Sequence, residues 1–261
     1  MDELARFRLA GRVAIVAGGS GGIGVRACAA LAGVGARVAV VGRDAARLEE
    51  ARAAVESAGS EALVLAGDMA SKTDADAAVA ATVERFGRLD VLVNAIGGGA
   101  GTALYAAEEY PEAEWDRIVD LNLRTTLLPS QAAVRAMIAA GNGGRILNIS
   151  SVRGQLGIDA GYSAYVAAKG ALDALTRQHA TEWAKHGITV NAISPTFVRT
   201  AQAESLLAQP GFYDRLVARI PLRRIAETDD LVGAILFFCS DASSFVTGQI
   251  LTLDGGLTAT Q

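Results

Sequence analysis

The sequence has little of the chemistry on which disulfides, thiol catalysis or metal sites depend. Only two cysteines and two histidines occur among 261 residues. Cys28 and Cys239 stand among apolar neighbours, which favours buried thiols over a disulfide or a reactive sulfur. His179 and His186 lie on one amphipathic stretch without a cluster of further ligands, so we interpret them as solvated helix positions and expect no metal.

Basic charge and long apolar runs are also scarce. The formal net charge is -4 and no run of lysine or arginine concentrates positive charge, which argues against nucleic acid as a partner. The first residues mix acids with arginines, unlike a signal peptide, and no apolar run approaches the ~20 residues of a membrane span. We therefore expect a cytoplasmic protein that binds neither nucleic acid nor membranes.

Short β-branched runs alternate with longer alanine-rich stretches along the whole chain, which is typical of repeated βα units. The runs that we expect to be strands are 12–17, 37–42, 62–67, 89–95, 144–150, 188–194 and 249–255. The stretches between them carry apolar residues at three-to-four spacing, which predicts helices that pack on a sheet. We predict one α/β domain over residues 1–261, with a doubly wound, seven-stranded parallel sheet and helices on both faces.

A glycine-rich turn follows the first predicted strand. Gly18, Gly22 and Gly24 form a G-x-x-x-G-x-G pattern between that strand and the next helix. A backbone without Cβ atoms can approach a pyrophosphate closely, and the helix N-terminus supplies amide donors. A glycine-rich turn can also be purely structural. Its place in the first βαβ unit favours the other interpretation, a Rossmann fold that binds a dinucleotide.

Polar residues gather near the ends of the fourth and fifth predicted strands. Asn94 ends the fourth strand, and Ser150 and Ser151 end the fifth. Asn122 falls inside a predicted helix, where asparagine is unfavourable unless its amide has a role. Each residue alone fits a turn, a loop or a helix kink. Together with Tyr165, fourteen residues after Ser151, they indicate a single crevice.

Tyr165 and Lys169 are spaced to share one face of a helix. The reference pKa of tyrosine is about 10, too high for efficient proton transfer near neutral pH, and an adjacent ammonium group lowers it. The alanines around the pair leave room for a bound molecule. The pair therefore indicates an acid–base catalyst. Tyr162 lacks such a partner, because Val166 lies four residues beyond it.

These motifs, in this order, resemble the short-chain dehydrogenase/reductase family over nearly the whole chain. The matching positions are Gly18, Gly22, Ile23, Gly24, Asp68, Asn94, Ala95, Gly97, Asn122, Ser151, Tyr165, Lys169 and the segments 195–200 and 246–256. The resemblance implies an NAD(P)-dependent oxidoreductase that interconverts a secondary alcohol and a ketone. In such an enzyme Tyr165 transfers the proton and Ser151 holds the substrate oxygen. Lys169 would also bind the nicotinamide ribose, and Asn122 would hold a water that relays protons to solvent.

The resemblance also implies which residues contact the dinucleotide. These are Gly18, Ser20, Gly22, Ile23, Gly24, Asp68, Met69, Asn94, Gly97, Tyr165, Lys169, Pro195, Val198 and Thr200. Among them, Asp68 and the backbone of Met69 would contact the adenine, and Asn94 would support the cofactor-side strand. Val198 and Thr200 would hold the carboxamide and the pyrophosphate.

The end of the second predicted strand bears on the choice between NAD and NADP. Gly42 has no side chain there, whereas an enzyme specific for NAD usually places an acid at this point to bind the ribose 2′-hydroxyl. Arg43 follows, and its planar guanidinium suits a 2′-phosphate. Asp44 is better placed as the N-cap of the next helix. We therefore predict that NADP(H) is preferred, with NAD(H) as an alternative cofactor.

The chain departs from the family pattern at several positions. Ala17 and Ala95 replace polar residues, Thr196 replaces a glycine beside the nicotinamide, and Arg223 replaces the glycine usual in its motif. The stretch between Ser151 and Tyr165 is also about one residue longer than in the family, which predicts a small bulge. These differences alter loop hydrogen bonds and the substrate wall while leaving the proposed chemistry in place.

The segment after Thr200 and the family resemblance bear on the substrate and the assembly. Segment 200–222 is short and amphipathic, and we expect it to form a lid. The chain most resembles the gluconate 5-dehydrogenase-like branch, which implies a sugar acid, a polyol or another small carbonyl compound. Arg153, Gln155 and Tyr162 either line a polar pocket or are solvated loop residues. The family resemblance implies a homotetramer.

Two other functions compete with this interpretation. A protein of the same fold could bind a dinucleotide as a sensor or scaffold without turnover, although such proteins usually lack the tyrosine or the lysine. A methyltransferase could also use a glycine-rich loop, but that function would not explain Tyr165, Lys169 and Asn122.

Overall fold

The computed structural model describes residues 3–99 and 103–260, and a parallel sheet forms its centre. The strands lie in the order β3-β2-β1-β4-β5-β6-β7, and every neighbouring pair is parallel. Their bounds are β1 (Val13–Ala17), β2 (Arg37–Gly42), β3 (Ala62–Ala66), β4 (Val91–Asn94), β5 (Gly144–Ile149), β6 (Ile188–Pro195) and β7 (Ile250–Leu253). All seven predicted strands are confirmed, and the strand order reverses direction between β1 and β4, where doubly wound folds place their ligands.

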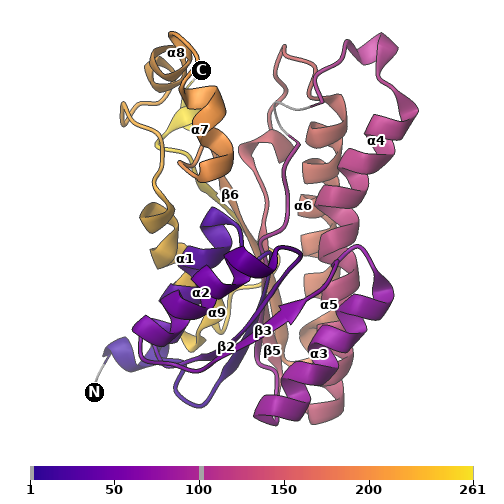
Figure 1. Cartoon of the computed structure of the whole chain (residues 1–261), viewed down its shortest axis with the longest axis vertical. Helices are drawn as coiled ribbons and strands as arrows, with labels where there is room; N and C mark the ends of the chain where they lie inside the picture. The colour runs from indigo at the N-terminus through magenta and orange to yellow at the C-terminus, as the bar shows by residue number, and fades with distance from the viewer. Residues whose placement is uncertain (1–2, 100–102, 261) are drawn as a thin grey trace.

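Helices cover both faces of this sheet, as predicted (Figure 1). The helices are α1 (Gly22–Gly33), α2 (Ala45–Ser57), α3 (Lys72–Phe86), α4 (Glu112–Val119), α5 (Thr125–Ala140), α6 (Ser163–Trp183), α7 (Ala201–Leu207), α8 (Phe212–Ala218) and α9 (Val232–Cys239). Side chains of α1, α2 and α9 pack on one face, and those of α3, α5 and α6 pack on the other. Because successive strand residues point to opposite faces, Val38 and Val40 join the first layer, and Ala39 and Val41 join the second.

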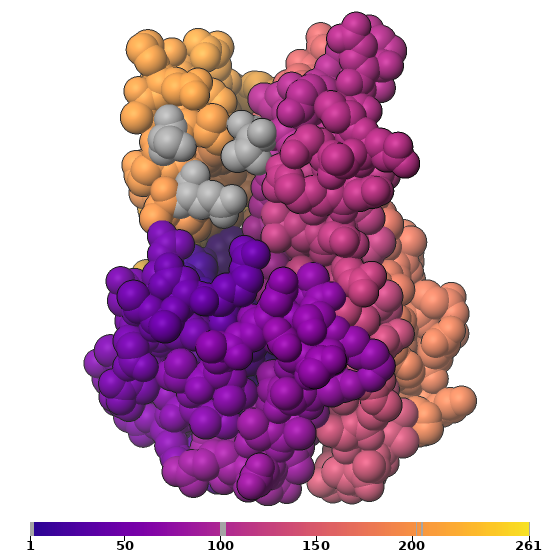
Figure 2. Space-filling view, turned by 45° about the vertical axis from the view of Figure 1, so that its right-hand side comes forward, coloured from indigo at the N-terminus to yellow at the C-terminus, as the bar shows by residue number. Residues whose placement is uncertain are grey.

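Helices α7 and α8 stand at the opposite end of the molecule from the N-terminus (Figure 1). In Figure 2 this orange segment and the magenta segment around α4 form two lobes above the N-terminal half. Both lobes follow the carboxyl ends of strands, because α4 lies beyond β4 and α7 lies beyond β6. The loops that carry the predicted site residues therefore meet at this end of the sheet.

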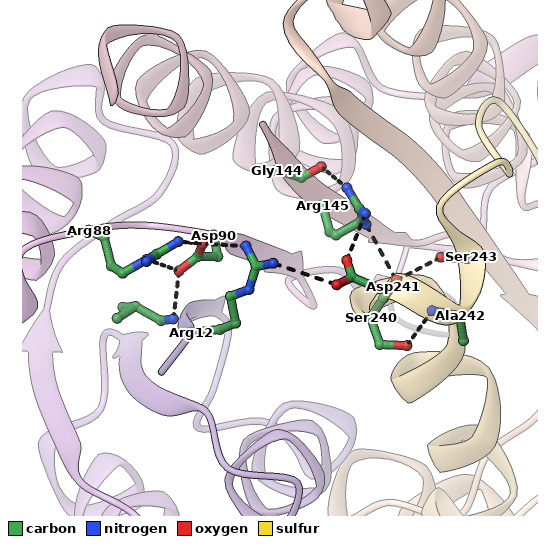
Figure 3. Close-up of polar contacts among 10 residues, drawn as sticks. Arg12, Arg88, Asp90, Gly144, Arg145, Ser240, Asp241, Ala242 and Ser243 are labelled. Carbon is green, nitrogen blue, oxygen red and sulfur yellow. Dashed lines mark hydrogen bonds and ion pairs between the residues drawn. The ribbon is translucent and has the colours of Figure 1, made fainter. Parts of the chain in front are cut away.

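The amino ends of the strands are joined by an ionic cluster (Figure 3). Asp90, just before β4, is 3% exposed. It accepts hydrogen bonds from the Val13 N–H at 2.9 Å, from Arg12 at 3.0 Å and from Arg88 at 2.6 and 2.8 Å. Arg145 of β5 donates to Asp241 at 3.0 Å, and Arg12 lies 3.6 Å from the same carboxylate. The cluster ties β1, β4 and β5 together at the end of the sheet opposite the lobes.

The rare residues of the sequence fall mostly, though not entirely, where predicted. Cys28 and Cys239 are free and buried, and His186 is exposed. The expectation for His179 is wrong: it is 6% exposed and stacks on Trp183 with ring centroids 3.9 Å apart. Burial lowers the pKa of His179 to about 4, so its neutral form is the one that packs inside.

Across residues 3–99 and 103–260, no three histidine, cysteine or acidic side chains gather in a way that could hold a metal ion. In the same ranges, no helix combines the length and the apolar character needed to cross a bilayer.

Candidate active site

A cavity of about 190 Å³ opens at the carboxyl ends of β4, β5 and β6. Eight of the residues predicted to form the site line it, namely Ile23, Gly97, Ser151, Tyr165, Lys169, Pro195, Val198 and Thr200. They come from the glycine-rich turn, two strand ends, α6 and the segment before α7. The structure therefore brings together residues that are more than 170 positions apart in the sequence, as the predicted crevice requires.

Tyr165 and Lys169 occupy successive turns at the start of α6. Lys169 is 3% exposed, and its ammonium group donates to the carbonyl oxygen of Ile149 at 2.9 Å and lies 5.8 Å from the centroid of the Tyr165 ring. Burial lowers the pKa of Lys169 to about 8, although the nearby carboxylate of Asp173 opposes this change. A lysine with this pKa can hold or release a proton near neutral pH.

Asp173 lies one further turn along the same helix and is 4% exposed. It accepts a hydrogen bond of 2.5 Å from the hydroxyl of Ser150, the residue next to Ser151. Burial raises the pKa of this carboxyl, against the opposing effects of that hydrogen bond and of Arg177 and Lys169. Asp173 thus connects the end of β5 to α6 directly behind the predicted catalytic pair.

The acidity of Tyr165 differs from the expectation based on sequence. Burial raises the pKa of its phenol, and this effect exceeds the lowering by a hydrogen bond to Ser151 and by the positive charge of Arg153. Ser151 and Arg153, which lower this pKa, both lie outside α6.

Asn122 lies in a π-helical segment, η3 (Asp120–Arg124), between α4 and α5. Its amide nitrogen donates to the carbonyl oxygens of Gly98 and Ile118, both at 2.9 Å, and its oxygen accepts from the Gly98 N–H at 3.1 Å. A Cβ on Gly97 would lie 3.0 Å from both the Asn122 oxygen and the Lys169 nitrogen. Asn122 therefore fixes the loop after β4, and a glycine at 97 lets this loop pass beside Lys169.

The glycine-rich turn fits a dinucleotide pyrophosphate. A Cβ on Gly24 would lie 2.0 Å from the carbonyl oxygen of Gly18, and one on Gly22 would lie 2.9 Å from Cγ2 of Thr200. Helix α1 begins after Gly21, which has no side chain that could cap the first N–H groups of the helix. A bare backbone and uncapped N–H groups at one helix end are what a phosphate group requires.

The end of β2 also matches the prediction. Gly42 leaves space for Ser20, whose hydroxyl would lie 2.6 Å from a Cβ at that position. Asp44 caps α2, since its side chain accepts from the N–H groups of Ala46 and Arg47. Arg43 is exposed between them and makes no ion pair with a described residue. Its guanidinium is therefore available to an anionic group near the turn.

Other predicted contacts lie outside the cavity. Asn94 is 1% exposed and donates to Ser130 and Asn148, both at 2.9 Å, which places its amide inside the protein between β4 and β5. Asp68 follows β3 and accepts from the Ala70 N–H at 3.0 Å, and Met69 is buried. The contact of Asp68 and Met69 with the adenine therefore stays a prediction. Asn94 supports the sheet.

Apolar lining was the part of the site that the sequence analysis missed. Phe197, Ala203 and Leu206 line the cavity, together with Ile96 and Ile149. Ala203 and Leu206 lie three residues apart on α7, so their spacing could have indicated an inward face. These residues give this part of the cavity a largely apolar wall.

The structure distinguishes among the residues whose roles the sequence did not decide. Gln155 is exposed, whereas Arg153 is partly buried. Tyr162 stands edge to face with Tyr165 at 6.5 Å and does not line the cavity. Thr196 does line it, as its place beside the predicted nicotinamide requires. Arg223 adopts a left-handed φ of 55°, the conformation that explains why glycine is usual there.

Comparisons with known proteins cover nearly the full chain. A family model described as enoyl-(acyl carrier protein) reductase matches residues 17–258. An uncharacterised oxidoreductase from Mycobacterium tuberculosis is 40% identical over 261 residues, covering 98% of this chain and 94% of that protein. Gluconate 5-dehydrogenase from Gluconobacter oxydans is 38% identical over 255 residues, covering 97% of this chain and 96% of the relative. The crystal structure of a gluconate 5-dehydrogenase from Burkholderia cenocepacia, in complex with NADP and tartrate, has a TM-score of 0.91 and 33% identity and covers 99% of both chains.

Proposed function

The chain belongs to the short-chain dehydrogenase/reductase family and is an oxidoreductase acting on CH–OH groups, and we propose that it interconverts a secondary alcohol and a ketone with NADP(H). One observation carries this proposal: Ser151, Tyr165 and Lys169 line the same cavity as Ile23 of the glycine-rich turn. The relatives named as gluconate 5-dehydrogenases support a sugar acid or a polyol as substrate.

The dinucleotide would extend from the glycine-rich turn to α6. Gly18, Ser20, Gly22 and Gly24 would surround the pyrophosphate at the uncapped start of α1, with Ile23 beside it. The remaining contacts are those predicted from the sequence: Arg43 at the 2′-phosphate, Asp68 and Met69 at the adenine, Lys169 and Tyr165 at the ribose, Gly97 beside them, and Pro195, Val198 and Thr200 at the nicotinamide end.

When bound, the cofactor supplies or accepts the hydride. In the reductive direction, Tyr165 donates its proton to the substrate oxygen, and the Ser151 hydroxyl donates a hydrogen bond that orients that oxygen. Lys169, with its pKa lowered to about 8, replaces the tyrosine proton. Asn122 holds the loop at Gly98 in place beside Lys169. As proposed from the sequence, it would also hold a water that relays protons to solvent. Oxidation reverses each proton transfer.

Segment 200–222 would act as the lid of this site. Ala203 and Leu206 of α7 already line the cavity, and α8 packs through Leu216 and Val217 on the cluster that contains Val152. We also propose a homotetramer. Leu251 on the edge strand β7 is 41% exposed, and Phe245 just before β7 is fully exposed, so a second copy could cover both. Light scattering would test the tetramer, and a monomer at micromolar concentration would refute it.

A spectrophotometric screen tests the proposed reaction. Secondary alcohols are offered with NADP and NAD, and ketones with NADPH and NADH, while absorbance of the reduced nicotinamide is followed. We expect turnover with at least one sugar acid or polyol and a higher kcat/KM with NADP(H). Tight dinucleotide binding without turnover on any compound would instead favour a sensor.

A further inference from the structure

Asp173 places a buried acidic side chain one helical turn beyond Lys169. The residue is 4% exposed, and aspartate is almost never buried this deeply unless it is paired. Residues four positions apart on a helix are neighbours on one face, with about 5–6 Å between their Cβ atoms. Asp173 therefore extends the face of α6 that carries Tyr165 and Lys169.

The carboxylate of Asp173 is fixed between the end of β5 and the short helix η4 (Val152–Gly154). Its Oδ1 accepts the hydrogen bond of 2.5 Å from the Ser150 hydroxyl. Its Oδ2 faces η4, where a Cβ on Gly154 would lie 2.6 Å from it. Glycine at position 154 therefore leaves the space that the carboxylate occupies.

A second polar contact fixes the register of α6 on β5. Asn148, two residues before Ser150, donates to Oγ1 of Thr176 at 2.9 Å. Residues two apart on a strand point to the same side, and Thr176 lies three residues after Asp173 on the same side of α6. Both pairs hold the helix along the strand. The place of Asp173 beside Lys169 is therefore set by packed backbone and not by a mobile side chain.

In residues 3–99 and 103–260, the elements packed on α6 bring no second acid to Lys169. Strand β6 carries no charged residue, and the charged residue of β5, Arg145, lies at the opposite end of its strand. The charge of Arg153 on η4 acts on Tyr165. The charged residues of α4, η3 and the short helix η5 (Ala184–His186) are exposed or paired with one another, namely Glu112, Glu114, Asp116, Arg117, Asp120, Arg124, Lys185 and His186. Asp173 is therefore the buried acid that acts on Lys169.

Lys169 and Asp173 each oppose the effect of burial on the other. Burial lowers the pKa of Lys169 to about 8, and the charge of Asp173 acts in the opposite direction. Burial raises the pKa of Asp173, and the hydrogen bond from Ser150 and the charges of Arg177 and Lys169 oppose that change. Each group thus favours the charged form of the other. Without the carboxylate, the ammonium group would lose its proton at a lower pH.

We propose that Asp173 is a positioning residue of the reaction: its carboxylate, held by Ser150, keeps the ammonium group of Lys169 charged at neutral pH and so sets the upper pH limit of ketone reduction. This inference rests on the proposed function, because Lys169 replaces the proton that Tyr165 gives to the substrate. A neutral lysine has no proton to return to the tyrosinate. Reduction should therefore fall as the pH rises through the pKa of Lys169, and it should fall at a lower pH when the carboxylate is removed.

A direct titration of Lys169 tests the electrostatic part of this inference. The chain has three lysines, and the other two, Lys72 and Lys185, are exposed. NMR of protein labelled with ¹³C at the lysine Cε atoms therefore follows three signals against pH, and Lys169→Arg assigns the signal of Lys169 by its loss. We expect a midpoint near pH 8 in the wild type. Asp173→Asn should lower this midpoint by at least about 1 unit, because a nearby opposite charge shifts a pKa by about 1–3 units.

Two substitutions at position 173 separate the charge from the hydrogen bond. Asp173→Asn removes the charge and keeps an acceptor for Ser150, whereas Asp173→Ala removes both. If the charge acts on Lys169, both variants shift its midpoint equally, and Asp173→Ala also has the lower Tm. If Asp173 only attaches α6 to β5, Asp173→Asn titrates as the wild type does, which would overturn the inference. Asp173→Asn alone decides between these results if Asp173→Ala does not fold.

An exposed pair of the same spacing supplies the matched control. Lys72 and Asp76 form an ion pair at the i, i+4 positions of α3, and both side chains are exposed. Asp76→Asn removes the same charge from the protein surface. It should leave the midpoint of Lys169 and the rate of reduction unchanged. An equal shift of the Lys169 midpoint in Asp76→Asn would show an effect of net charge and refute the assignment of Asp173.

The pH profile of ketone reduction tests the consequence for catalysis. The pH dependence of kcat/KM reports the groups of the free enzyme. A midpoint lower by one unit reduces the protonated fraction of Lys169 about fivefold at pH 8 and hardly changes it at pH 6, so Asp173→Asn should lose activity mainly at the higher pH. A loss by the same factor at every pH would indicate a purely structural role and contradict the inference.

The two measurements distinguish failure of this inference from failure of the proposed function. A lowered Lys169 midpoint in Asp173→Asn, without turnover of any compound by the wild type, would support the contact between Asp173 and Lys169 and refute the proposed reaction. Turnover by the wild type, together with an unchanged midpoint and an unchanged pH profile in Asp173→Asn, would refute the inference and leave the proposed function standing.

Discussion

The ionic cluster around Asp90 offers a test of the fold that does not touch the site (Figure 3). Asp90→Asn keeps the shape of the side chain but removes its charge and turns one acceptor into a donor that faces arginine and backbone donors. Breaking a buried ion pair on one side costs about 3–5 kcal/mol. Arg12 and Arg88 retain 36% and 35% side-chain exposure and can be rehydrated, so the loss is smaller, about 2 kcal/mol.

A loss of that size is measurable by thermal unfolding. For a chain of this length, 1 kcal/mol corresponds to about 2–4 °C in Tm, so Asp90→Asn should lower Tm by about 4–8 °C. Asp241→Asn is the matched control, because that carboxylate is 58% exposed and should lower Tm by less than about 2 °C. Alcohol oxidation at 25 °C should be unchanged in both variants, since the cluster lies at the opposite end of the sheet from the cavity.

The difference in Tm between the wild type and Asp90→Asn should become smaller as the pH falls. Burial raises the pKa of Asp90, but hydrogen bonds from Arg88, the Val13 N–H and Arg12 outweigh it, and the pKa lies below its ordinary value. The folded state thus releases this proton more readily than the unfolded state. The stabilisation is fully present above about pH 4 and is lost as the pH falls through the lowered pKa. A Tm difference below about 1 °C at neutral pH, or one that grows in acid, would refute this reasoning.

Two further predictions concern the dinucleotide. Gly24→Ala should abolish dinucleotide binding, measured by cofactor fluorescence, because its Cβ would lie 2.0 Å from the Gly18 carbonyl oxygen; Gly33→Ala, in open space at the end of the same helix, should bind normally. Normal binding by Gly24→Ala would contradict the proposed cradle. Arg43→Ala should reduce the preference for NADPH over NADH in kcat/KM by about 10- to 100-fold, since it removes a charge-assisted contact to the 2′-phosphate. An unchanged ratio would show that Arg43 is only a solvated residue.

The sequence was sufficient to predict the parallel sheet, because β-branched runs bounded by glycine and proline leave few alternatives to parallel strands. Asp44 as a helix cap could be predicted for the same reason: capping depends on neighbours in the chain. The glycine pattern also predicted a turn in which the backbone segments approach too closely for a Cβ atom. The close approach of Gly24 to Gly18 agrees with that prediction.

Properties that depend on tertiary burial could not be predicted in this way. His179 was expected in solvent, but the folded chain leaves it only 6% exposed. The pKa of Tyr165 was expected to fall beside Lys169, whereas burial by distant segments raises it.

The most direct test of the proposed reaction is the turnover of Tyr165→Phe, measured with the best substrate from the screen and with dinucleotide affinity determined in parallel. Tyr162→Phe is the matched control, because Tyr162 lies three residues earlier and does not line the cavity. The proposed mechanism predicts that Tyr165→Phe retains dinucleotide affinity and loses at least ~10²-fold in kcat, while Tyr162→Phe stays close to wild type. Turnover by Tyr165→Phe near the wild-type rate would contradict the assignment of Tyr165 as the proton donor and acceptor.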